Sequence, residues 1–138
     1  MDENVLDILI TSRIKSKDAV YDYVWDICKD LKIHRLNRTI NITFRQKLAE
    51  DAWGWAVGDT QECDIEINRT IDWSYQLVTL AHELVHAKQY FRKELDASFA
   101  WKGRNWSKCE YEWQPWERQA HALELKLFQK HWKYWKEN

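Results

Sequence analysis

The stretch Thr79-Leu-Ala-His-Glu-Leu-Val-His-Ala87 organises the interpretation of the whole chain, because it carries an H-E-x-x-H motif inside an apolar run. On an α-helix His82 and His86 lie one turn apart, so both imidazoles leave the same face. Two neutral imidazoles at that separation can bind one Zn²⁺, at about 2.0–2.1 Å each. Glu83 is placed to reach a water on the metal and to act as a general base.

The residues around the motif favour a helix over a chance match. Asp72 is a suitable N-cap residue, and no glycine or proline interrupts residues 72–93. Four apolar residues recur at helical spacing and predict a buried face: Leu77, Ala81, Leu84 and Val85. We therefore predict a helix over this range that carries a metal, rather than two histidines that merely occupy polar positions.

The length and charge of the chain limit the number of domains and the classes of partner that we expect. The chain has 138 residues, a length typical of one domain with its own core, so we expect a single domain over residues 1–138. The formal net charge is −1 with both signs interspersed, so no overall field attracts nucleic acid or an acidic membrane. The sequence shows no signal peptide and no run of transmembrane length, and we expect a cytoplasmic protein without a membrane partner.

Cysteine and tryptophan contents add two expectations. The three cysteines are an odd, sparse set, so they do not predict a disulfide framework. Cys63 and Cys109 are candidates for extra zinc ligands or a latency switch, but idle thiols are the favoured interpretation. Ten tryptophans against three glycines predict heavy aromatic packing or an aromatic-lined groove.

The hydrophobic period changes along the chain. Residues 1–36 have helical periodicity, and residues 40–44, 53–57 and 63–67 have the alternation or β-branched and aromatic content of strands. Residues 102–105 look like a turn within an aromatic-rich segment, which forms either a wall of a substrate cleft or a packed surface loop. A last helix is expected from Trp116 to about Trp135, after Pro115. The predicted fold class is α+β: a small, three-stranded or larger, mixed or antiparallel sheet packed on helices.

A third metal ligand has to come from outside the motif. Glu117 lies in the first turn of the last predicted helix, which can aim its side chain rigidly. His121 is one turn further along the same face and is the rival, since zinc accepts both oxygen and nitrogen ligands. The alternative for Glu117 is a carboxylate that only complements the helix dipole.

Three segments together resemble small zincin metallopeptidases, including SprT-like domains and compact gluzincins of the phage type. These segments are residues 64–68, residues 79–89 with H-E-x-x-H, and residues 114–120 with P-W-E-x-x-A. The resemblance implies a zincin-like fold, zinc-dependent peptide hydrolysis in a cytoplasm (the host's, if the protein is phage-encoded), and a mixed sheet whose edge strand, residues 63–67, lies along the cleft. It also implies that a glutamate helix supplies Glu117 as the third zinc ligand, with Ala120 as its small neighbour.

The match departs from that pattern at His121, which stands where thermolysin-like members carry an aspartate that supports a zinc ligand. SprT-like proteins often use a third histidine as a ligand, which keeps His121 open as an alternative. With the resemblance included, Glu117 is favoured over His121.

The main functional hypothesis is a zinc metallopeptidase with a peptide or protein substrate. His82, His86 and Glu117 hold Zn²⁺, and Glu83 is the general base. Tyr111, His121 and Tyr90 are candidates to stabilise the oxyanion, with Tyr111 placed first among them. The substrate backbone is expected to pair with the strand at 63–67.

The rival hypothesis is a non-catalytic, zinc-stabilised module of SprT type that binds DNA or protein. The balanced charge argues against strong DNA binding, because such affinity comes from phosphate neutralisation. Residues 131–136 interleave basic and aromatic side chains, as single-strand nucleic-acid binders and membrane-interface segments do. Core packing with a solvated lysine face is the favoured interpretation of that tail.

Overall fold

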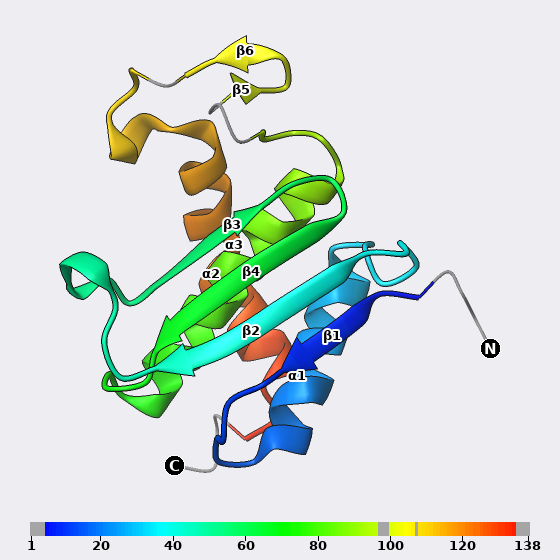
Figure 1. Ribbon diagram of the computed structural model, residues 1–138, viewed down its shortest axis with the longest axis vertical. Coiled ribbons are helices and arrows are strands. Elements are labelled where there is room, and N and C mark those ends of the chain that lie inside the picture. Colours follow the sequence, from blue (N-terminus) through cyan, green and yellow to red (C-terminus); the bar gives the residue numbers. More distant parts are fainter. Residues whose placement is uncertain (1–4, 97–99, 107, 135–138) are drawn as a thin grey trace.

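The computed structural model describes residues 5–96, 100–106 and 108–134, and Figure 1 shows their arrangement. Within this part of the chain, a four-stranded mixed sheet and three helices form an α+β fold. In chain order the helices and strands are β1 Asp7–Ile10, α1 Lys17–Asp30, β2 Thr39–Arg45, β3 Gly54–Gly58, β4 Glu62–Asn68, α2 Trp73–Phe91, β5 Ala100–Trp101, β6 Arg104–Asn105 and α3 Pro115–His131.

The strand order in the sheet is β1-β2-β4-β3. β1, β2 and β4 run parallel, and β3 pairs antiparallel with β4 at the edge. The buried side chains of the two central strands alternate along each strand and join the core: Ile40, Ile42 and Phe44 on β2, and Cys63, Ile65 and Ile67 on β4. This period-two alternation buries one face of the sheet against the helices that cover it (Figure 1).

Two sequence predictions about the sheet are wrong. Residues 7–10 form strand β1 and not a helix, because Leu6 and Ile8 are buried by pairing beside β2, and a short apolar run fits either period. The strand at residues 63–67 is not an edge strand, because β4 is paired on both sides. The edge next to α2 is β3. The predicted helix in the later part of residues 1–36 is confirmed as α1.

α2 is the central helix. Most of its residues are buried, because it lies between the sheet and α3 and contacts α1 as well. Beyond the end of α3, Trp132 packs edge-on against Tyr23 and Trp73, with ring centroids 5.5 and 6.2 Å apart. The expected core packing of the tail is therefore confirmed at Trp132, while residues 135 and 136 lie outside the described residues.

The turn predicted at 102–105 is confirmed at residues 102–103, which connect β5 to β6, whereas residues 104–105 form strand β6. Lys102 and Gly103 both have positive φ angles, 50° and 84°, as two-residue hairpin turns of the primed type require. Among the described residues, no helix combines the length and apolar character that crossing a membrane demands.

Candidate metal centre

α2 and α3 bring two imidazoles and one carboxylate together. Glu117 Oε1, in the first turn of α3, lies 2.9 Å from His82 Nε2 and 3.2 Å from His86 Nε2. Both histidines are buried, with 8% and 6% of their surface exposed. The structure thus places Glu117 between the two motif histidines, at the position that the sequence assigned to the third ligand.

This group fits a zinc ion in both chemistry and spacing. Its three ligand atoms lie within 4.8 Å of one another. Ligands at zinc's usual distances in a tetrahedron are separated by about 3.3 Å, close to the two distances that Glu117 makes. Two nitrogens and one oxygen are a ligand set that zinc accepts, and three protein ligands leave a fourth position for water or substrate.

The other nitrogen of each imidazole has an oxygen partner. His82 Nδ1 lies 3.0 Å from Glu124 Oε1, and His86 Nδ1 lies 2.7 Å from Gln89 Oε1. Both oxygens are acceptors, so each Nδ1 carries a proton and donates, which aims Nε2 toward Glu117. Gln89 is itself fully buried and donates from Nε2 to the Trp116 carbonyl oxygen over 2.9 Å, so its side chain is held in place.

Burial and neighbouring charged groups shift the pKa values of the side chains in this site. Burial lowers the pKa of His82, but its hydrogen bond to Glu117, the charge of Glu83 and its hydrogen bond to Glu124 outweigh burial and raise that pKa to about 9. Burial raises the pKa of Glu117, but the hydrogen bonds from His82 and His86 outweigh it and hold that pKa well below its usual range. A cation bound between these three side chains would therefore compete with protons for the same nitrogen and oxygen atoms.

Glu83 lies beside the ligands without joining them. It is 5% exposed, and burial raises its pKa to about 7, against the opposing charges of His86 and His82. It lines a cavity of ≈ 380 Å³ with eight other residues: Ala52, Trp53, Gly54, Thr79, His82, Tyr111, His121 and Glu124. A buried carboxylate with a pKa near neutrality, facing a cavity, has the properties of a general base.

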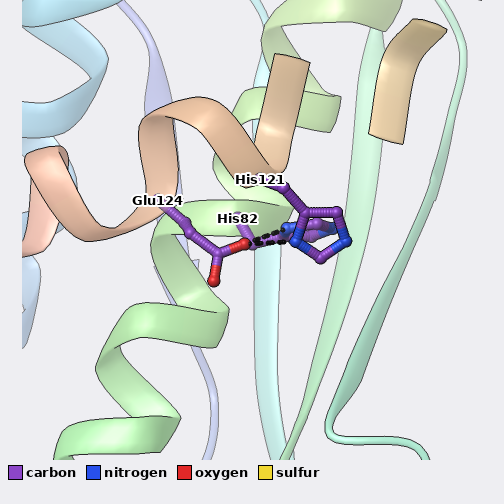
Figure 2. Close-up of side chains that lie close together, drawn as sticks. All are labelled: His82, His121 and Glu124. Carbon is purple, nitrogen blue, oxygen red and sulfur yellow. Dashed lines mark hydrogen bonds and ion pairs between the residues drawn. The ribbon is translucent and has the colours of Figure 1, made fainter. Parts of the chain in front are cut away.

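A second histidine–carboxylate group shares His82 with the first. Figure 2 shows Glu124 directed at both imidazoles. Its Oε1 lies 3.0 Å from His82 Nδ1 and 2.7 Å from His121 Nδ1. His82 Nδ1 carries the proton of one of these bonds, so it has no lone pair for a cation, and His121 is exposed. The group of His82, His86 and Glu117 is therefore the stronger candidate for a metal centre, and Glu124 is a carboxylate that accepts hydrogen bonds from two imidazoles.

Sequence reasoning missed Glu124, although its signal was present. Glu117, His121 and Glu124 follow one another at i, i+4 and i+7, so they share one face of α3. Glu124, three residues beyond His121, supplies the carboxylate oxygen at His82 Nδ1.

Of the three candidates for oxyanion stabilisation, only Tyr111 and His121 line the cavity. The Tyr111 hydroxyl donates to Glu117 Oε1 over 3.0 Å and lies 3.1 Å from His121 Nε2, and both side chains line the cavity. Tyr90 does not belong to the cavity lining, and its hydroxyl interacts with the backbone of Gly58 at the end of β3. Among the described residues, neither Cys63 nor Cys109 belongs to a potential metal-binding group.

The chain has no match among protein-family models, curated proteins or solved structures. The resemblance to small zincin metallopeptidases therefore depends on the motif segments alone. The geometry of the candidate metal centre and of the cavity beside it is the evidence that bears on function.

Proposed function

We propose that this protein is a zinc-dependent metallopeptidase, with His82, His86 and Glu117 as the zinc ligands. The observation that carries the proposal is the convergence of these three side chains beside buried Glu83, at the wall of an open cavity. A zinc site with three protein ligands is the arrangement of catalytic rather than structural sites.

When bound, the zinc ion lowers the pKa of a water toward about 7 and polarises a carbonyl group. Glu83 accepts the proton of the attacking water and delivers it to the leaving amine nitrogen. Its burial suits this exchange, because burial raises the pKa of the carboxyl group and makes Glu83 a stronger base than an exposed glutamate.

Tyr111 and His121 line the same cavity as Glu83. The Tyr111 hydroxyl, and the protonated form of His121, can donate hydrogen bonds to the oxygen that gains negative charge. Glu124 orients His121 and His82 together, since both Nδ1–H groups donate to its Oε1. A carboxylate at the outer nitrogen of a zinc ligand fixes its tautomer and raises its basicity.

The substrate backbone is best accommodated by edge strand β3, in place of the strand at 63–67. Asn68 N donates to the Trp53 carbonyl and Asp59 N to the Glu62 carbonyl, so the odd-numbered residues of this strand direct their polar groups at β4. In an antiparallel ladder the intervening residues, Gly54 and Ala56, then direct theirs outward. Gly54 also lines the cavity, so a peptide added to this edge would pass the metal centre.

The decisive experiment is cleavage of a mixed peptide library by the zinc-loaded protein, with products identified by mass spectrometry. We expect cleavage that a chelator abolishes and added zinc restores. A variant with Glu62→Gln, an exposed glutamate of β4 outside the cavity, is the control and should cleave like the wild type. Cleavage that persists in chelator, or no cleavage of any peptide by fully zinc-loaded protein, would reject the proposal.

A further inference from the structure

Two exposed aromatic rings stack on one another beside the cavity, and one of them, Trp53, is part of its lining. Trp53 and Tyr75 each have 51% of their surface exposed, and their rings stack on one another with centroids 5.3 Å apart and planes 22° apart. Trp53 lines the cavity together with His82 and Glu83. Large apolar surfaces left open to water beside a cavity are characteristic of ligand-binding sites.

The pair is held by the backbone around it. At Gly54 a Cβ atom would lie 2.6 Å from Thr79 Cγ2, so the start of β3 rests directly on α2. The Trp53 carbonyl oxygen accepts the Asn68 N–H over 2.8 Å, and Asn68 Nδ2 donates to the Ala52 carbonyl over 3.1 Å. The backbone beneath the Trp53 ring is therefore fixed, while the ring itself remains accessible.

Tyr75 belongs to the same face of α2 as the metal ligands. Tyr75, Thr79, His82 and His86 follow one another at i, i+4, i+7 and i+11. At 1.5 Å per residue, Tyr75 lies roughly 10 Å along the helix axis from His82. An extended peptide covers that length in about three residues.

The charge of the cavity restricts what these rings can bind. The ionisable lining residues are Glu83, Glu124, His82, His121 and Tyr111, and no lysine or arginine is among the lining residues that the structure describes. A polyanion such as nucleic acid would meet two carboxylates without a phosphate-binding cation. An apolar side chain stacks on the rings without that penalty.

We propose that Trp53 and Tyr75 form a substrate subsite for one aromatic or large aliphatic side chain of an extended peptide, about three residues from the bond that is cleaved. The inference rests on the proposed peptidase function and adds a substrate class to it. Trp53 and Tyr75 are specificity-determining residues in this arrangement, since they contact the substrate far from the reacting atoms.

The test uses a peptide series that differs only by phenylalanine or serine at single positions on either side of the cleaved bond. The wild type should prefer phenylalanine at one position about three residues from that bond. Trp53→Ala and Tyr75→Ala should reduce the phenylalanine-to-serine ratio of kcat/KM there by roughly 10-fold or more, as the loss of one apolar contact surface predicts. Trp53→Phe, which keeps an aromatic ring, should retain most of the preference.

Tyr21→Ala is the matched control, because Tyr21 is an exposed tyrosine on α1, 41% exposed and outside the cavity lining. It should leave the preference unchanged. A wild type without preference at any position, or Tyr21→Ala and Tyr75→Ala with equal effects, would overturn the subsite. So would a sedimentation experiment in which Trp53→Ala only dissociates a dimer of this chain and leaves peptide preference intact.

Binding separates the failure of the subsite from the failure of the peptidase function. In the Glu83→Gln protein, a fluorescently labelled phenylalanine peptide should bind more tightly than its serine counterpart, and Trp53→Ala in that background should remove the difference. If no peptide is cleaved but this Trp53-dependent binding persists, the peptidase proposal fails and the subsite stands. If peptides are cleaved and the binding difference is absent, the subsite fails alone.

Discussion

Glu124 Oε1, on α3, accepts a hydrogen bond from His82 Nδ1, on α2, over 3.0 Å. The same oxygen accepts a second hydrogen bond from His121 Nδ1 over 2.7 Å. One carboxylate therefore orients both an expected metal ligand and a second imidazole that lines the cavity. Glu124 therefore connects the candidate metal centre with His121 in the cavity lining.

Replacement of Glu124 should weaken metal binding without removing it. Outer partners of ligating histidines typically contribute 10- to 100-fold in metal affinity, so we expect a decrease of that order in Glu124→Ala. Glu124→Gln keeps an acceptor oxygen and should lie between Glu124→Ala and the wild type. Competition for zinc with a chromophoric chelator measures the affinities, with Glu62→Gln as the control, and equal affinities in all four proteins would show that Glu124 does not support the site.

Glu83 and His86 should separate chemistry from metal binding. Glu83→Gln should retain zinc and lose activity by about 10²–10⁴-fold, because it removes the proton acceptor and leaves all three ligands.

His86→Ala should lose zinc, because only two protein ligands remain. Metal analysis of the purified variants and peptide cleavage give the two readouts, and full activity in Glu83→Gln would exclude the general-base role.

Zinc removal should lower the melting temperature but leave the chain folded. The hydrophobic core is built from apolar side chains of the sheet and helices and contains none of the three ligands. Zinc at 100 times its Kd would add about 2.7 kcal/mol by mass action. Thermal unfolding followed by circular dichroism, with and without chelator, checks this. Complete unfolding on chelation, without peptide cleavage, would instead favour a structural zinc in a binding module.

Gly54→Ala should destabilise the fold, because the added Cβ would lie 2.6 Å from Thr79 Cγ2 and 3.0 Å from the Glu66 carbonyl oxygen. Overpacking of this kind costs about 1–3 kcal/mol. Thr79→Ser removes the methyl group and should restore part of the loss in the double variant. Urea unfolding of the four proteins measures the coupling, and additive effects of the two changes would contradict direct contact.

Asp30 should give a pH-dependent contribution to stability. Its pKa is lowered by the hydrogen bond from His131, with a further contribution from Lys130, and these two residues at the end of α3 together outweigh the opposing effect of burial. A lowered folded-state pKa means that the contribution is present above the unfolded-state pKa of about 3.9 and is lost as pH falls through the folded-state value.

Asp30→Asn should accordingly cost stability at pH 7 and cost progressively less toward pH 3. The effect should stay within about 1 kcal/mol, because the side chain of Asp30 is 30% exposed and solvent screens the pair. Urea unfolding of both proteins across this range provides the comparison, and a difference that grows as the pH falls would reverse the assigned sign.

Several local features of the fold could be predicted from periodicity. The helices at Trp73–Phe91 and Pro115–His131, the strands at Thr39–Arg45 and Glu62–Asn68, and the hairpin turn near Gly103 follow from spacing and turn residues. β1 could not be predicted, because a four-residue apolar run has no distinct period and becomes a strand only through its pairing with β2.

The sequence by itself determined that His82, Glu83 and His86 share one region of a helix, since a 3.6-residue period leaves no freedom over four residues. Only the tertiary structure decided that β3 is the edge strand, that Glu124 reaches His82, and that Trp53 stacks on Tyr75. These relationships join residues far apart in the chain, and their geometry is set by how the sheet, α2 and α3 pack together.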